Sequence, residues 1–223
     1  MISAEMLDFF RELKENNNKE WFNPRKADYK RMREAFTAGL EAMAQQIAFF
    51  DQTIADHLGD PSTVKVFRIY RDVRFSKNKE PLKTNMGGYI SAGGERPAYY
   101  LHVEPGSSFA GGGIYRPSTP ALKAIRAEID ESYPELAAIL QDERFRAVYP
   151  QGLSRELALK TAPRGVSKDH PAIEYLRLTS FTVFRPCSDE ELLSEGFEDR
   201  LLGTFEAQVA LHAYLDKALL HQE

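Results

Sequence analysis

The feature that most constrains the fold is a run of apolar side chains at helical spacing in the first quarter of the chain. Successive members lie three or four positions apart, and they are Tyr29, Met32, Phe36, Leu40, Met43, Ile47 and Phe50. Such intervals put side chains on one face of an α-helix. Asn23 and Pro24 supply a cap followed by a proline in the first turn. We therefore predict a helix from Pro24 to Phe50, whose apolar face needs a large partner surface.

The sequence that follows favours strands as this partner. Residues 64–75 are rich in β-branched and aromatic side chains, which suit a pleated surface. Turn signals at Gly93-Gly94 and Pro105-Gly106 have the spacing of an antiparallel meander. The further strands that we predict cover residues 88–92, 98–104, 107–115 and 181–184.

Helical patterns return on both sides of these strands. Ser3 caps a first helix that ends at the asparagine run 16–18, and Thr119 opens another. Pro134 begins a short helix, and a final long helix starts at about Glu195. We predict one α+β domain over residues 1–223, with a central antiparallel sheet flanked by long N-terminal and C-terminal helices.

Composition limits the class of protein. The 43% of hydrophobic residues suffice for a core, and the single cysteine, Cys187, rules out an internal disulfide. The first residues lack the pattern of a signal peptide, and no apolar stretch approaches the ~18 residues of a membrane span. A net charge of −4 argues against a protein that coats nucleic acid. We expect a cytoplasmic protein without a membrane partner.

One short segment contradicts the acidic average. Residues 67–85, "FRIYRDVRFSKNKEPLKTN" and here the basic segment, hold two acidic side chains, Asp72 and Glu80, and six basic ones: Arg68, Arg71, Arg74, Lys77, Lys79 and Lys83. In an extended chain Arg71 falls on the face of Phe67 and Ile69, so we predict that it is mostly buried and paired. Two interpretations are open: a structural network of arginines and carboxylates, or an anion site.

A glycine-rich stretch, "PGSSFAGGGIYRPSTP", follows at residues 105–120. It places Gly112 and its neighbours beside Arg116, before a helix N-terminus with free N–H groups. Glycines in a strand also mark bulges or tight packing. The stretch matches neither a P-loop nor a dinucleotide fingerprint. Beside the basic segment it favours a phosphate-bearing ligand.

His102 and Glu104 lie two positions apart and point the same way from a strand. Such a pair can begin a metal site or serve as an acid and a base. No second pair at metal-ligand spacing accompanies it, although His170 could join through the fold. We predict neither a metal ion nor a cofactor.

Several blocks resemble a conserved family of bacterial and some fungal proteins, domain of unknown function 2461. They are "NNNKEWF" at 16–22, the basic segment, "YYLHVEPG" at 99–106, "GGGIYRP" at 111–117 and "APRGVSKDHP" at 162–171. The resemblance implies a single α+β domain in a bacterial protein. It implies no mechanism, because the family has no established activity.

Two functional hypotheses follow, and whether the protein is an enzyme stays open. In the first, the chain recognises a phosphorylated or carboxylated small molecule, and any catalysis uses Asp72, His102 and Glu104. The residues expected to bind this anion are Arg68, Arg71, Arg74, Lys77, Lys79, Lys83, Gly112 and Arg116. In the second, less favoured hypothesis, the basic segment binds nucleic acid or a protein, with Tyr70 and Phe75 as stacking surfaces.

Overall fold

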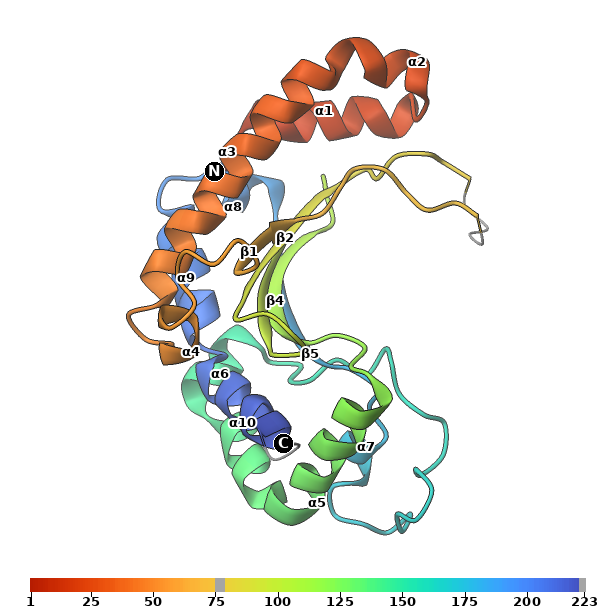
Figure 1. Cartoon of the computed structure of the whole chain (residues 1–223), viewed down its shortest axis with the longest axis vertical. Helices are drawn as coiled ribbons and strands as arrows, with labels where there is room; N and C mark the ends of the chain where they lie inside the picture. Colours follow the sequence, from red (N-terminus) through yellow and green to blue (C-terminus); the bar gives the residue numbers. More distant parts are fainter. Residues whose placement is uncertain (75–78, 221–223) are drawn as a thin grey trace. The chain divides into compact units, whose positions relative to one another are not determined.

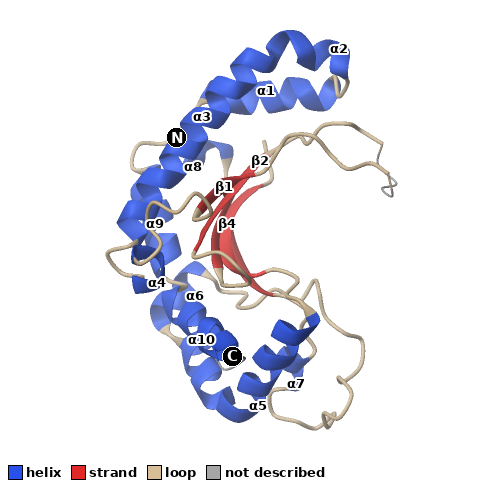
Figure 2. Ribbon diagram, viewed as in Figure 1, coloured by secondary structure: helices blue, strands red, loops and turns tan. Residues whose placement is uncertain are grey.

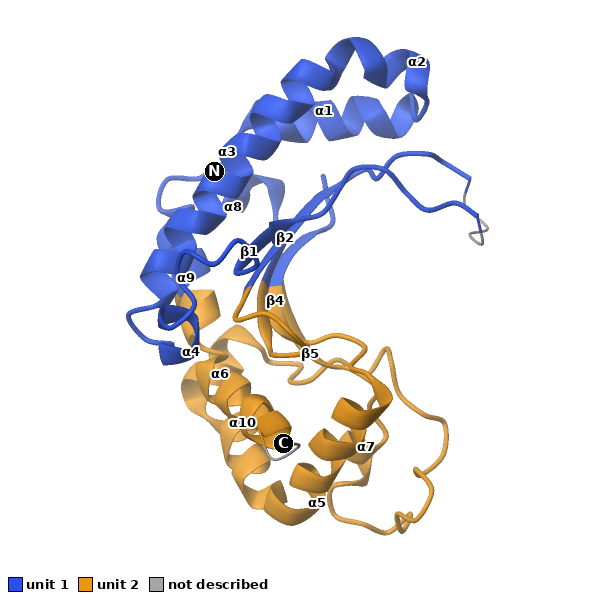
Figure 3. Cartoon of the chain, viewed as in Figure 1, with its two compact units in different colours: residues 1–90, 100–110, 186–202 blue, residues 91–99, 111–185, 203–223 orange. Residues whose placement is uncertain are grey.

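The computed structural model describes residues 1–74 and 79–220, and the chain divides into two compact units (Figure 3). Unit 1 consists of Met1–Ile90, Tyr100–Ala110 and Pro186–Leu202. Unit 2 consists of Ser91–Tyr99, Gly111–Arg185 and Gly203–Glu223. The predicted single domain over residues 1–223 stays a prediction.

Helices and strands are grouped along the chain, as Figures 1 and 2 show: helices come first, β1 to β4 follow in succession, and further helices lie on both sides of β5. In the first half they are α1 (Ala4–Glu15), α2 (Lys19–Phe22), the 3-10 turn η1 (Asn23–Arg25), α3 (Lys26–Ile47), α4 (Gln52–Ala55), β1 (Val64–Val66), β2 (Met86–Ser91), β3 (Ala98–Val103) and β4 (Ser108–Ile114). In the second half they are α5 (Thr119–Gln141), α6 (Glu143–Val148), α7 (Ile173–Leu176), β5 (Phe181–Cys187), α8 (Asp189–Leu193), α9 (Phe197–Glu206) and α10 (Val209–Leu220).

The predicted α+β class with an antiparallel sheet is confirmed. The five strands follow one another in the order β1-β2-β3-β4-β5, so each strand pairs with its neighbour in sequence. At the β1 edge, Val64 lies opposite Ile90 and Val66 lies opposite Gly88. This simple order explains why short turns suffice between β2, β3 and β4.

In unit 1 the long helix α3 packs against the sheet, as its periodicity predicts. Phe36, Leu40 and Ile47 are all at most 1% exposed. The approach is closest at Gly88, where an added Cβ would lie 2.5 Å from a methyl carbon of Leu40. A glycine on β2 therefore lets the helix come close to the strand.

The N-terminal helices of unit 1 are joined by side-chain caps and an aromatic cluster. The hydroxyl of Ser3 accepts from Met6 N, and the amide oxygen of Asn18 accepts from Trp21 N. The ring of Phe9 packs against Trp21 at 5.4 Å between centroids, and against Phe22 and Tyr29. The asparagine run thus ends α1 and begins α2 within three residues.

Unit 2 has its own core between α5, α10 and the adjoining strand residues. Ile125, Ile129, Phe181 and Leu211 are fully buried in it. The helices predicted from Thr119 and from Pro134 are the two halves of α5, which kinks at Ser132. A proline two positions further on explains the kink, because its ring disfavours helical backbone before it.

The strand predicted at residues 64–75 is wrong beyond Val66. Only an isolated bridge, between Tyr70 and Leu82, continues the pairing, and Phe75 lies outside the described residues. Backbone hydrogen bonds run from Phe67 N to Gly87 O at 2.9 Å and, after a change of register, from Lys83 N to Ile69 O at 2.8 Å. Between these two bonds the chain has one residue on one side, Arg68, and three on the other, 84–86. This inequality interrupts the regular ladder, and Phe67 is 44% exposed instead of facing the core.

The final long helix predicted from about Glu195 is two helices, α9 and α10. The chain turns between them at Ala207 and Gln208. The side chain of Gln208 is fully buried and donates to Gly111 O at 3.1 Å. The prediction of one helix assumed a continuous apolar stripe. It did not allow for a polar side chain directed inward at Gln208.

The glycines of β4 allow two strands to approach within unit 2. A Cβ on Gly111 would lie 2.0 Å from Val183 O, and one on Gly112 would lie 2.2 Å from Ala98 O. Gly113 adopts a φ of 108°, in the left-handed region that favours glycine. Tight packing, one of the two readings of the glycine-rich stretch, is therefore what the structure shows at these positions.

No helix in the described parts of the chain is both long enough and apolar enough to cross a membrane.

We predict that Gly112→Ala destabilises the fold by about 1–3 kcal/mol, because the methyl group meets backbone that cannot move aside. Gly203→Ala is the matched control, since no atom lies within 4 Å of its added Cβ. In α9 this change should leave stability unchanged or raise it by up to about 1 kcal/mol. Urea unfolding measures both variants, and equal midpoints would contradict the packing role of Gly112.

Candidate functional site

The alternation of β3 sorts its side chains into two sets. Leu101 and Val103 are fully buried, whereas Tyr100 and His102 are only partly buried. Glu104 follows the strand and is also partly buried. Because neighbouring side chains of a strand point to opposite faces, the three polar groups share the face opposite the buried ones.

These three groups form a hydrogen-bonded chain. Nε2 of His102 lies 3.2 Å from Oε2 of Glu104, and Nδ1 lies 2.9 Å from Oη of Tyr100. A carboxylate only accepts hydrogen bonds, so the proton of a neutral imidazole belongs on Nε2. Nδ1 is then an acceptor, and the phenol O–H of Tyr100 donates to it.

Aromatic rings enclose the hydrogen-bonded groups Tyr100 and His102. The ring of Phe109 stacks on that of His102 with centroids 4.8 Å apart and planes 13° apart. Phe67 lies beside Tyr100 at 6.2 Å. Gly87 leaves room for the phenol, since a Cβ there would be 2.5 Å from Oη. These contacts fix the rings and remove water from them.

Burial by these rings shifts the pKa values of His102 and Tyr100 and so sets their protonation states. Burial, with a smaller effect of the positive charge of Lys83, lowers the pKa of His102 below 6.5, although Glu104 acts in the opposite direction. Burial, aided by the negative charge of Glu104, raises the pKa of Tyr100 to about 12. At neutral pH the imidazole is therefore uncharged and the phenol keeps its proton.

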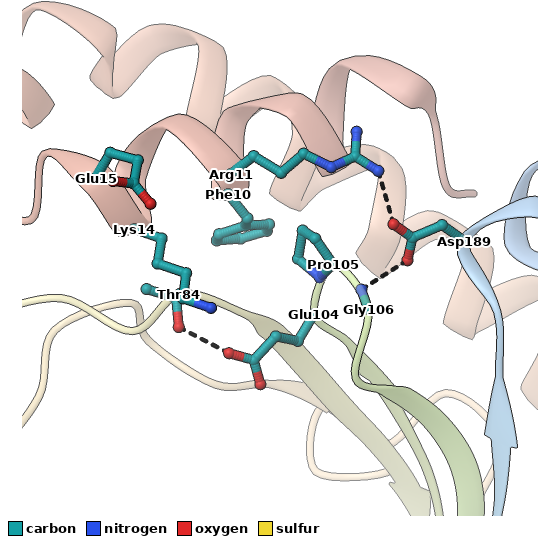
Figure 4. A pocket seen from close by; sticks show the side chains of 9 residues that line it. All are labelled: Phe10, Arg11, Lys14, Glu15, Thr84, Glu104, Pro105, Gly106 and Asp189. Atoms are coloured by element: carbon teal, nitrogen blue, oxygen red, sulfur yellow. Dashed lines mark hydrogen bonds and ion pairs between the residues drawn. The ribbon is translucent and has the colours of Figure 1, made fainter.

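The second carboxylate oxygen of Glu104 faces a pocket of about 310 Å³ in unit 1 (Figure 4). Oε1 accepts a hydrogen bond from the hydroxyl of Thr84 at 2.9 Å. On the far side of the pocket, Asp189 accepts from Arg11 at 2.6 Å and from Gly106 N at 2.9 Å. The other lining residues are Phe10, Lys14, Glu15 and Pro105.

The N-terminal helices hold the basic segment in place. The amide of Asn17 makes two hydrogen bonds with the backbone of Leu82, accepting from N at 3.1 Å and donating to O at 3.0 Å. Arg33 donates to Val66 O at 3.2 Å. The block "NNNKEWF" therefore has a structural purpose, since its second asparagine supplies the ladder partner that Leu82 lacks.

Several charges of the basic segment are satisfied within it. Arg74 binds Asp72 through two hydrogen bonds of 2.9 and 2.7 Å, which hold the pKa of that carboxyl below its usual range. Lys79 donates to Val73 O at 3.0 Å. An ionised carboxylate engaged in this way is a poor proton donor, so the structure does not favour Asp72 as a catalytic acid.

Arg71 lies 3.6 Å from Glu80, and 30% of its side chain remains exposed. It is therefore paired with a carboxylate, as predicted, but it is only partly buried. Lys77 belongs to residues 75–78 and lies outside the described residues.

Arg68 and Lys83 differ from these residues, because neither has an ion pair with a carboxylate of the described chain. Lys83 is partly buried, with its ammonium group 5.1 Å from the centre of the Phe67 ring. Burial, and then the like charges of Arg68 and Arg71, lower its pKa. We name Arg68, Arg71 and Lys83 together the Lys83 cluster. The positive charge of Lys83 acts on His102.

Gly112 and Arg116 belong to unit 2, whereas the basic segment belongs to unit 1, so a site that joins them stays a prediction. Within unit 2, a carboxylate of the protein itself already occupies the N-terminus of α5. Glu95 accepts from Ser118 N at 2.9 Å and from its hydroxyl at 2.6 Å. Arg116 is exposed and has a φ of 50°, with its N–H donating to Ser180.

The described residues hold no group of three or more His, Cys, Asp and Glu side chains arranged for a metal ion. Within unit 2, His170 pairs with Asp130 at 2.9 Å and accepts from Ala172 N, so both of its ring nitrogens are occupied. The expectation of a metal-free protein stays a prediction.

Tyr100 is absent from the residues expected at the site, although the sequence contains its signal. It precedes His102 by two positions, as His102 precedes Glu104, so a period of two along one strand predicts all three. The role of Asn17 has no comparable signal, because its partner Leu82 is 65 positions away.

We predict that the neutral state of His102 makes stability depend on pH. Its folded pKa is lowered, so the unfolded chain binds a proton more readily, and stability is lost as the pH falls from 6.5 through the folded pKa. From about pH 7 to about pH 5 the melting temperature of the wild type should therefore fall more than that of His102→Gln. Parallel declines in thermal melts would contradict this.

Comparison with known proteins places the chain in one group. The sequence pattern of a family described as a conserved hypothetical protein, DUF2461, matches residues 5–214. No curated protein and no solved structure matches the chain. The match runs from the first turn of α1 into α10, and it includes the basic segment and residues 100–104. The protein therefore belongs to the family of conserved hypothetical proteins DUF2461.

Proposed function

We propose that the protein recognises a small phosphorylated or carboxylated molecule at the Lys83 cluster. The observation that carries this proposal is the setting of Lys83, a partly buried ammonium over the Phe67 ring that has no ion pair with a carboxylate of the described chain. The like charges of Arg68 and Arg71 act on it. A buried cation without a counter-ion costs free energy, and an anion bound there would offset that cost.

The shape of the cluster suits an anion with more than one acceptor oxygen. Two guanidiniums offer paired N–H groups, which match the geometry of phosphate and carboxylate, and Lys83 adds a point charge. The exposed ring of Phe67, 44% accessible, supplies an apolar surface next to the ammonium. Mixed polar and aromatic lining is typical of small-molecule sites.

The structure narrows the residues proposed for this site. Arg74 and Lys79 are engaged within the basic segment, so we assign them to its structure. Arg71 remains a candidate because its pairing with Glu80, at 3.6 Å, is loose and partly exposed. The proposed ligand contacts are thus Arg68, Arg71 and Lys83.

A cytoplasmic and bacterial setting belongs to the same proposal, since metabolites of this kind and a single buried Cys187 suit a reducing compartment.

Binding of nucleic acid is the alternative, with exposed Phe67 and Tyr70 as stacking surfaces. We favour the small molecule because three of the segment's cations, Arg71, Arg74 and Lys79, have partners within the segment. Salt separates the two functions, since contacts to a nucleic-acid backbone weaken steeply with ionic strength.

We predict that inorganic phosphate, or a member of a panel of nucleotides, sugar phosphates and dicarboxylates, raises the melting temperature at low salt. A ligand at about 100 times its Kd stabilises the native state by about 2.7 kcal/mol. In Lys83→Gln this rise should vanish, while the melting temperature without ligand stays equal or increases, because a desolvated charge is removed. Differential scanning fluorimetry measures both quantities.

Lys30→Gln is the matched control, because Lys30 lies on α3 with 77% of its side chain exposed. It should keep the full ligand-induced rise. A complete panel without any rise contradicts the proposal. Binding of a single-stranded oligonucleotide with a steep salt dependence, and no rise with small anions, would instead establish the alternative.

A further inference from the structure

The hydrogen-bonded chain beside the Lys83 cluster has a defined direction. Glu104 fixes the proton of the neutral imidazole on Nε2, so Nδ1 presents its lone pair to Tyr100 Oη at 2.9 Å. The carboxylate is itself held by Thr84 at 2.9 Å. This is an arrangement in which a base is oriented by a third group and lies within reach of an O–H.

We propose that Tyr100, His102 and Glu104 form a proton relay that makes the Tyr100 oxygen a general base toward an anionic substrate. This deepens the proposed function and rests on it for the substrate class, since the Lys83 cluster would hold the anionic part. Tyr100 is then the catalytic residue, and His102 and Glu104 are positioning residues that act through it.

The proton transfer balances within these groups. The substrate's acidic proton passes to Tyr100 Oη while the phenol's own proton passes to Nδ1 of His102. The electron pair stays on the substrate atom, where the charge of Lys83 stabilises it. The imidazolium that forms is stabilised by the carboxylate of Glu104, 3.2 Å away. The transfer is reversed when product leaves, so no further reactant is required.

An ordinary tyrosine could not do this at neutral pH. Its pKa is near 10, and burial has raised that of Tyr100 to about 12, so the free tyrosinate is scarce. A proton acceptor in contact with Oη avoids the tyrosinate, because the proton leaves during the reaction and not before it. The relay therefore predicts reactivity that follows the imidazole and not the phenol.

Several charged groups act on the imidazole and set its protonation. Glu104 lies at Nε2, and Lys83 acts from the basic segment, where the charges of Arg68 and Arg71 act in turn on Lys83. From α1, Lys14 and Glu15 line the pocket on the other side of Glu104. Burial is the largest effect and lowers the pKa of His102, so the relay is ready to accept a proton above about pH 6.5.

The test labels Tyr100 with benzenesulfonyl fluoride. The phenol oxygen bonds to sulfur, the S–F bond breaks, fluoride leaves and the phenol proton passes to His102. The rate at Tyr100, followed by peptide mass spectrometry, should rise to a plateau at or below about pH 6.5. A tyrosine that reacts only as its phenolate instead speeds up about tenfold per pH unit across this range. Tyr89, on the adjacent strand and without a histidine partner among the described residues, is the internal reference.

His102→Gln should slow the labelling of Tyr100 by about tenfold or more and remove the plateau, with Tyr89 unchanged. Glu104→Gln keeps an acceptor for Nε2–H but loses the charge, so it should slow Tyr100 by several-fold if His102→Gln does not fold. An unlabelled Tyr100, or a rate that climbs steadily with pH in the wild type, overturns the relay. Neither result affects the thermal response to anions, so failure of the relay and failure of the anion site are distinguishable.

Discussion

The pleat of a single six-residue strand is the constraint on which the candidate site depends. On β3 the side chains that enter the core, Leu101 and Val103, alternate with the ones that meet each other outside it, Tyr100 and His102. Burial of the first set fixes the register, and a slip by one residue would send the imidazole into the core. Burial of Leu101 and Val103 on one face of β3 thus fixes the positions of Tyr100 and His102 on the other face.

The basic segment shows how one short region can combine structure and a candidate function. Its charges are not equivalent, because Arg71, Arg74 and Lys79 find partners within the segment. Arg68 and Lys83 have no ion pair with a carboxylate of the described chain. Exposed pairs such as that of Arg74 with Asp72 contribute little to stability. Their effect is to hold the chain so that the remaining positive charge is concentrated beside β3. The basic segment therefore contains both structural cations and cations without a carboxylate partner among the described residues.

Much of the fold could be predicted from the sequence, because periodicity reports directly on burial. The face of α3 that carries Phe36 and Leu40, and the strands β2 to β4, follow from patterns of three to four and of two. The break after Val66 could not be predicted in this way. It depends on a change of register between residues 67–71 and 81–87, and such a change leaves no trace in the periodicity of either segment.

For the site, His102 and Glu104 were predictable as a pair from their spacing, whereas the state of each cation was not. Whether an arginine is paired depends on which carboxylate the fold brings near, as Arg71 with Glu80 illustrates. The glycines at residues 111–113 suggest a ligand as readily as tight packing. Only the distance from an added Cβ to the neighbouring backbone supports the second reading.

The amide of Asn17 also has a consequence for the order of folding. Its two hydrogen bonds close a loop of 65 residues, and such long-range contacts form after local ones because loop closure costs entropy. The helices α1 and α2 contain mostly local contacts and can form first. The basic segment then acquires its final conformation late, on a surface that already exists. The Lys83 cluster would accordingly be the last feature to form during refolding and the first to be lost on mild denaturation, while most helical signal persists.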